Sequence, residues 1–199
     1  MVEPIAAMHS LSHWLAALGT AEPGSPLSIA TVDAGLATVM ARRDGGAGIA
    51  DRLGMALPAG PARARDATMA LLGTGPGVWL AMAEGAGPCW AEELAERLSG
   101  VASVVDQSGG YAVLRLAGPG ALTLLSRGAF VDFDAAAFPT GSVMVTDIAH
   151  MGVIIARIDD APSFHVALFR SHAESFAHWI EATARGMGVQ PLASVGDAR

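Results

Sequence analysis

Two glycine motifs come closest in residue type and spacing to a nucleotide-binding loop. Gly46-x-Gly48-x-x-Asp51 follows an expected strand and lies at the start of an expected helix. A dinucleotide loop needs glycines where its backbone approaches the pyrophosphate, and a small third residue where helix and strand pack. Asp51 instead places a bulky anion at that third position. The second motif, at residues 73–77, leads into an expected strand, so no helix N-terminus would face a phosphate. Both motifs are interpreted as turns, and we expect no cofactor-binding residue in this chain.

Cys89 is the one cysteine of the chain, and it follows Pro88 at an expected helix start. Backbone amides at such a position would lower the pKa of the thiol. A cysteine nucleophile also needs a base and a group that orients the base, and no histidine stands nearby in the sequence. We therefore interpret Cys89 as a small packing or cap residue. A single cysteine excludes an internal disulfide and a multi-cysteine zinc site, and it favours a reducing, cytoplasmic compartment.

The histidines offer two weak patterns. His9 and His13 lie four residues apart on one face of an expected helix, a spacing that can bind a metal. No carboxylate lies between them, as a metalloprotease helix would require. Glu174, His178 and Glu181 share a face of the last expected helix, which is typical of a solvated surface. We expect no catalytic residue and no metal ligand in this chain. A metal or thiol enzyme that uses His9, His13 or Cys89 is the remaining alternative, and metal analysis together with an unaffected Cys89→Ser variant would exclude it.

Composition limits the class of protein. The chain has 199 residues, 19 acidic and 12 basic residues and a net charge of −7, and all the basic residues are arginine. This balance argues against nucleic-acid binding, which needs a basic patch. Hydrophobic residues make up 52% and charged residues 16%, where about 25% charged is usual. A membrane span needs about 20 continuous apolar residues, and none is present. Codon bias and a surface covered by partner proteins remain as explanations.

The hydrophobic pattern predicts an α+β fold with mostly antiparallel sheets and packed helices. Strands are expected to pair as hairpins, with helices between the pairs. Ser171 and Glu174 have the spacing of a capping box at the start of the last helix. The expected strands are 27–31, 36–42, 68–72, 78–83, 101–105, 111–117, 142–147, 151–158 and 163–169, and the expected helices are 47–55, 88–99, 119–127 and 171–186.

Three segments are expected along the chain. Apolar residues recur at helical spacing in the first 20 residues, and a Pro/Gly/Ser cluster follows at residues 22–26. We interpret residues 1–25 as an N-terminal helical arm, residues 26–188 as the main domain and residues 189–199 as a C-terminal tail.

Several motifs, in the same order along the chain, resemble a known family. The run 105–119, VDQSGGYAVLRLAGP, resembles the D-x-S…L-x-L-x-G segment of aminomethyltransferase-like domains. Residues 132–141 end in F-P-T-G and resemble that group's F-P-x-G segment. Residues 164–179 resemble its F…R-S-F-A…W end, with His172 where the family usually has Phe. Together with G-M-A-L-P at 54–58 and G-P-G-V-W-L at 75–80, these motifs make residues 27–187 most similar to the gamma subunit family of heterotetrameric sarcosine oxidase.

The resemblance implies an aminomethyltransferase/folate-binding-domain-like fold and a non-catalytic subunit that binds no cofactor. It implies alpha, beta and delta subunits as partners, with FAD, FMN, NAD, tetrahydrofolate and zinc on those subunits. The implied reaction is oxidative demethylation of sarcosine or a related N-methyl amino acid, linked to folate-dependent one-carbon metabolism. Both an oxidase and a dehydrogenase remain open. The alternative is a stand-alone folate-binding aminomethyltransferase-like protein.

Four residues are the candidates for an interface with such partners. Arg170 ends an expected strand, where its guanidinium could pair bidentately with a carboxylate within the chain or across an interface. Ser171 follows it, and Trp14 and Leu15 belong to the N-terminal arm. Phenylalanines 130, 133 and 138 are expected in the core. We expect deletion of residues 1–25 to weaken assembly more than folding.

Overall fold

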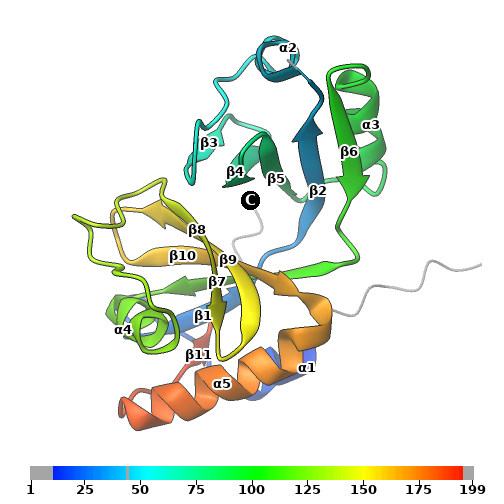
Figure 1. Ribbon diagram of the computed structural model, residues 1–199. Helices are drawn as coiled ribbons and strands as arrows, with labels where there is room; N and C mark the ends of the chain where they lie inside the picture. The colour runs from blue at the N-terminus through cyan, green and yellow to red at the C-terminus, as the bar shows by residue number, and fades with distance from the viewer. Residues whose placement is uncertain (1–10, 44, 195–199) are drawn as a thin grey trace, which may run out of the picture.

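Two β-sheets pack face to face, and each carries helices on its outer face (Figure 1). The computed structural model describes residues 11–43 and 45–194. The six-stranded sheet has the order β11 (Leu192–Ala193), β1 (Ser28–Thr31), β7 (Tyr111–Ala117), β10 (Ser163–Phe169), β9 (Met151–Asp159) and β8 (Val143–Ile148). The five-stranded sheet has the order β3 (Arg63–Arg65), β4 (Ala70–Gly75), β5 (Val78–Glu84), β2 (Ala34–Ala41) and β6 (Ala102–Asp106).

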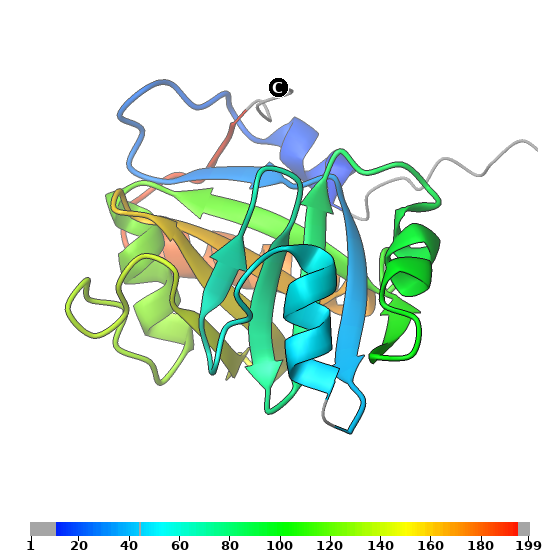
Figure 2. The same ribbon diagram turned by 90° about the horizontal axis from the view of Figure 1, so that it is seen from above.

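Helices cover the outer faces because the strands are apolar on both sides. In β10, Phe164 and Val166 point to the helices, whereas Ala167 points to the other sheet. Such doubly buried strands read as continuous apolar runs. Figure 2 shows α2 lying across the five-stranded sheet. The helices α2 (Gly45–Leu53) and α3 (Trp90–Arg97) cover that sheet, and α1 (Ser12–Ala17), α4 (Pro119–Gly128) and α5 (Ala173–Gly186) cover the six-stranded one.

Most expected strands are present, and the pairs β4–β5 and β8–β9 are antiparallel hairpins as predicted. The prediction that β6 and β7 form a hairpin is wrong. β6 pairs with β2, whereas β7 pairs with β1 and β10 in the other sheet. The connecting turn therefore carries the chain from one sheet to the other. A run of strand-forming apolar residues indicates a strand but not its partner, so the sequence pattern could not distinguish the two arrangements.

Other differences concern the ends of the chain and of the last helix. The predicted capping box is wrong: Arg170–His172 form a short 3-10 helix, and α5 begins after His172 with no side-chain cap. Within residues 11–25, the expected arm helix is limited to α1. β11 lies within the expected tail and pairs with β1 in parallel. Among the described residues, no helix is long and apolar enough to cross a membrane.

Candidate functional site

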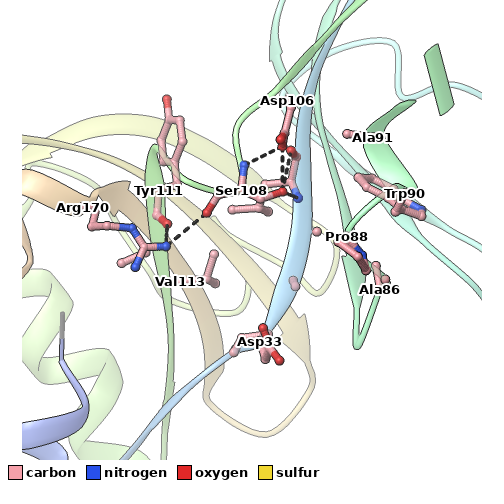
Figure 3. A pocket seen from close by; sticks show the side chains of 16 residues that line it. Asp33, Ala86, Pro88, Trp90, Ala91, Asp106, Ser108, Tyr111, Val113 and Arg170 are labelled. Carbon is pink, nitrogen blue, oxygen red and sulfur yellow. Dashed lines mark hydrogen bonds between the residues drawn. The ribbon is translucent and has the colours of Figure 1, made fainter. Parts of the chain in front are cut away.

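A cleft of about 360 Å³ lies where the chain passes between the two sheets (Figure 3). One wall is the start of β2 with the loop before α3, and the other is the start of β7 with Arg170. The β6–β7 connection at residues 107–110 borders the cleft. This cleft contains the residues of the D-x-S motif, so the family-like segment and the cavity coincide.

Asp106 and Ser108 form a tight turn that is fastened to β2. The Oδ1 atom of Asp106 accepts hydrogen bonds from the Ser108 backbone N–H at 2.9 Å and from its hydroxyl at 2.8 Å. The Leu36 backbone N–H donates to Ser108 Oγ at 3.0 Å, and the Gln107 N–H donates to the Leu36 carbonyl at 2.7 Å. Aspartate and serine suit this position because their short side chains can bond backbone groups two residues away. These hydrogen bonds attach the turn to β2 of the five-stranded sheet.

Arg170 holds the same turn from the six-stranded sheet. Its Nε donates to the Gly109 carbonyl, and its Nη2 donates to the carbonyls of Ser108 and Tyr111, each at 3.1 Å. Its backbone N–H donates to the Gly110 carbonyl at 2.9 Å. Turn carbonyls lack strand partners, and the planar guanidinium can bond several of them at once. The sequence offered no sign of these acceptors, since a carbonyl is the same for every residue type.

Aromatic rings enclose the cleft on both sides. The Trp90 ring lies against Gly35 so closely that a Cβ at Gly35 would come within 2.9 Å of it. On the other wall, the rings of Tyr111 and Phe169 are 4.8 Å apart. Burial raises the pKa of the Tyr111 hydroxyl. Because a Cβ at position 35 would collide with the Trp90 ring, glycine is required there for the indole to reach β2.

The sequence-predicted interface residues occupy two regions. Arg170 and the exposed Ser171 lie beside the cleft. Trp14 and Leu15 are partly buried on α1 and pack against the outer core, which is the apolar cluster between the six-stranded sheet and helices α4 and α5. Trp14 Nε1 donates a hydrogen bond to Glu181 Oε1 at 2.6 Å. Arg170 and Ser171 are thus separated in space from Trp14 and Leu15, so the four residues do not form one site. A role for any of the four in binding a partner stays a prediction.

The other sequence candidates are scattered. Cys89 is exposed and stands at the N-cap of α3 without a side-chain cap bond. His13 is exposed, and His9 lies outside the described residues. His178 is exposed on α5. Among the described residues, no group of three or more His, Cys, Asp or Glu side chains could hold a metal ion.

The two glycine motifs serve close packing. A Cβ at Gly48 would come within 2.8 Å of the Val101 side chain, and one at Gly73 would come within 1.9 Å of the Gly60 carbonyl oxygen. The second motif also lines a larger cavity of about 640 Å³ whose walls carry no charged side chain. These contacts explain Gly48 and Gly73 without any phosphate ligand, and the positive φ of 67° at Gly77 explains a third glycine.

A polar cluster closes one end of the space between the sheets. His165 is only 5% exposed, and its Nδ1 has no hydrogen-bond partner. Burial, with Arg63 and Arg115 nearby, lowers the pKa of His165 to about 3. Arg115 Nη2 lies 3.9 Å from Asp159 Oδ2. His165 is therefore neutral at physiological pH, and its place in the sequence gives no sign of this burial.

Solved structures of two known proteins share this fold. A chain of heterotetrameric sarcosine oxidase from Corynebacterium sp. U-96, solved with pyrrole 2-carboxylate, is similar with a TM-score of 0.79 and 24% identity, covering 91% of this chain and 96% of that chain. Glycine cleavage system aminomethyltransferase T from Bartonella henselae is similar with a TM-score of 0.58 and 16% identity, covering 84% of this chain and 48% of that chain. These likenesses confirm the expected α+β, aminomethyltransferase-like fold.

The sequence comparisons are more specific. No curated protein matches the chain significantly. A model of the sarcosine oxidase gamma subunit family matches residues 41–185, which include the Asp106–Ser108 turn and Arg170. The chain therefore belongs to the sarcosine oxidase gamma subunit family.

Proposed function

We propose that this chain is a non-catalytic gamma subunit that assembles with alpha, beta and delta subunits into a heterotetrameric enzyme of the sarcosine oxidase type. The family match over residues 41–185 carries this proposal. The similar chain of a heterotetrameric sarcosine oxidase is covered over 96% of its length, so the two have nearly the same extent. The assembly would act in the cytoplasm, with its flavins, NAD, tetrahydrofolate and zinc on the other subunits.

The use of the polar groups in the cleft supports a structural role. Three donor contacts of the Arg170 side chain go to carbonyl oxygens of the chain itself. Ser108 bonds Asp106 and β2. A catalytic group needs to reach a substrate atom, whereas these groups connect two sheets. The substrate, sarcosine or a related N-methyl amino acid, would be demethylated on the partner subunits.

The second candidate is a stand-alone folate-binding protein, favoured by the fold likeness to aminomethyltransferase T. This likeness covers 84% of the chain and 48% of that protein. Titration calorimetry of the isolated chain with tetrahydrofolate distinguishes the two candidates. We expect no heat of binding; saturable binding at one site would favour the second candidate.

Co-expression with the genes for the three partner subunits tests the assembly. The tag is placed on this chain, and the purified material is analysed by size-exclusion chromatography with flavin absorbance. We expect all four subunits and the flavin to elute together, with oxidation of an N-methyl amino acid. Recovery of this chain alone would overturn the proposal.

A further inference from the structure

Aromatic surface remains open beside the cleft. Phe169 is 48% exposed, although it directly precedes Arg170 and packs on Tyr111. Trp90 and Tyr111 line the cleft and are themselves only partly buried. Partly exposed aromatic rings around a cavity are typical of protein interfaces, where they form the central contacts. The composition and exposure of this surface are therefore those of a protein–protein interface.

The charged groups of the cleft favour a cation. Its charged lining residues are Asp33, Asp106 and Arg170, and both aspartates are exposed. Arg170 is directed at the carbonyls of the turn. Within the part of the chain that the structure describes, the hydrogen bonds to the Asp106 carboxylate reach Oδ1, and Oδ2 is available to accept a further donor. Figure 3 shows the two aspartates at opposite ends of the cleft, with Trp90 on one side and Tyr111 on the other.

We propose that this cleft receives an arginine or lysine side chain from a partner subunit. The cationic group would pair with Asp106 and lie against the faces of Trp90 and Tyr111, while Asp33 adds negative charge at the opposite end of the cleft. The volume of about 360 Å³ lies within the range of roughly 300–1,000 Å³ typical of ligand pockets. The inference rests on the proposed function, because the partner is a subunit of the same complex.

Removing the negative charges tests the inference in the co-expressed complex. Asn at position 106 keeps the Oδ1 acceptor that holds Ser108, so Asp106→Asn alters charge and not the turn. We expect the Asp33→Asn/Asp106→Asn double variant to raise the dissociation constant of the complex at least tenfold and to flatten its salt dependence. Asp132→Asn is the matched control, since exposed Asp132 also accepts a turn N–H through Oδ1, at 3.0 Å from Asp134 N.

Cys89 supplies a second readout because it is exposed and lies between Pro88 and Trp90, which both line the cleft. As the one cysteine of the chain, it can be labelled with iodoacetamide in the free subunit and in the complex. We expect labelling of Cys89 to slow at least tenfold on assembly. Labelling at the rate of the free chain would show that no partner covers this face, and would overturn the inference.

The outcomes separate the inference from the proposed function. If the wild-type chain forms no complex, the proposed function fails. If the wild type assembles and the double variant assembles with equal affinity and equal salt dependence, only the inference fails, and a small organic cation or a second copy of this chain becomes the candidate occupant. Equal thermal unfolding of the isolated wild type and double variant ensures that folding is not what changes.

Discussion

Arg170 is the side chain that fastens the β6–β7 turn to the six-stranded sheet. Three of its side-chain bonds, each 3.1 Å long, end on carbonyls of residues 108–111. Lysine keeps the charge but lacks the planar fork that reaches several carbonyls. We expect Arg170→Lys to lower the free energy of unfolding by about 1–3 kcal/mol, measured by urea denaturation. Exposed Arg185 on α5 provides the control variant Arg185→Lys, and equal losses in the two variants would contradict this role.

His165 makes stability depend on pH. Its pKa is about 3 in the folded chain and about 6.5 when unfolded. Below about pH 6.5 His165 is protonated in the unfolded chain, whereas in the folded chain it stays neutral until about pH 3. The free energy of unfolding therefore falls as the pH falls from about 6.5 to about 3. We expect His165→Met to reduce the loss of stability between pH 7 and pH 4 by up to about 3 kcal/mol.

Urea denaturation at several pH values measures the His165 effect. His178→Gln, at an exposed position on α5, controls for the loss of one histidine. An unchanged pH dependence in His165→Met would show that the fold does not lower the pKa of His165.

At the level of elements, the packing of α4 on α5 depends on glycine at position 128, which has no side chain. A Cβ at Gly128 would come within 2.3 Å of Trp179 Cζ2. Gly186 ends α5 as Gly128 ends α4, and a Cβ there would meet nothing closer than 3.9 Å. We expect Gly128→Ala to destabilise by about 1–3 kcal/mol, and Gly186→Ala to be neutral or slightly stabilising because alanine favours helices. Thermal denaturation of the two variants makes the comparison, and a neutral Gly128→Ala would refute the packing argument.

The part of the arm that the structure describes is joined to the main domain. Leu11 is 1% exposed within the outer core, and the Ala21 N–H donates to the Ala193 carbonyl at 2.8 Å. Deletion of residues 1–25 would therefore remove core contacts as well as any partner contacts. That this deletion weakens assembly more than folding stays a prediction, measured by comparing complex yield with the unfolding midpoint of the isolated chain.

At the scale of the whole molecule, exposed apolar side chains accompany the low charge. Phe130 is fully exposed, which corrects the expectation that it lies in the core beside Phe133 and Phe138. We expect Phe130→Ser to change the free energy of unfolding by less than about 0.5 kcal/mol and to reduce self-association of the isolated chain, measured by analytical ultracentrifugation. A large loss of stability would show that Phe130 packs within the fold.

The sequence by itself determined the local elements and the family. Short apolar runs bounded by turn residues predicted most strands, because a strand that is buried on both faces of a sheet is apolar along its whole length. The motifs at 105–119 and 164–179 indicated the family that residues 41–185 match. The sequence could not determine that β6 and β7 lie in separate sheets, since the two strands carry the same pattern in a hairpin and in separate sheets.

Only the tertiary structure decided what the motif residues do. Asp106, Ser108 and Arg170 are polar residues that could serve catalysis, binding or packing. Asp106 bonds Ser108 two residues away, but the partners of Ser108 on β2 and of Arg170 on the turn are backbone groups, which have no residue-specific signal and become neighbours only in the folded chain. The same is true of His165, whose lowered pKa comes from burial between sheets and from arginines distant in sequence. Side-chain chemistry is local, but solvation and hydrogen-bond partners depend on the packed fold.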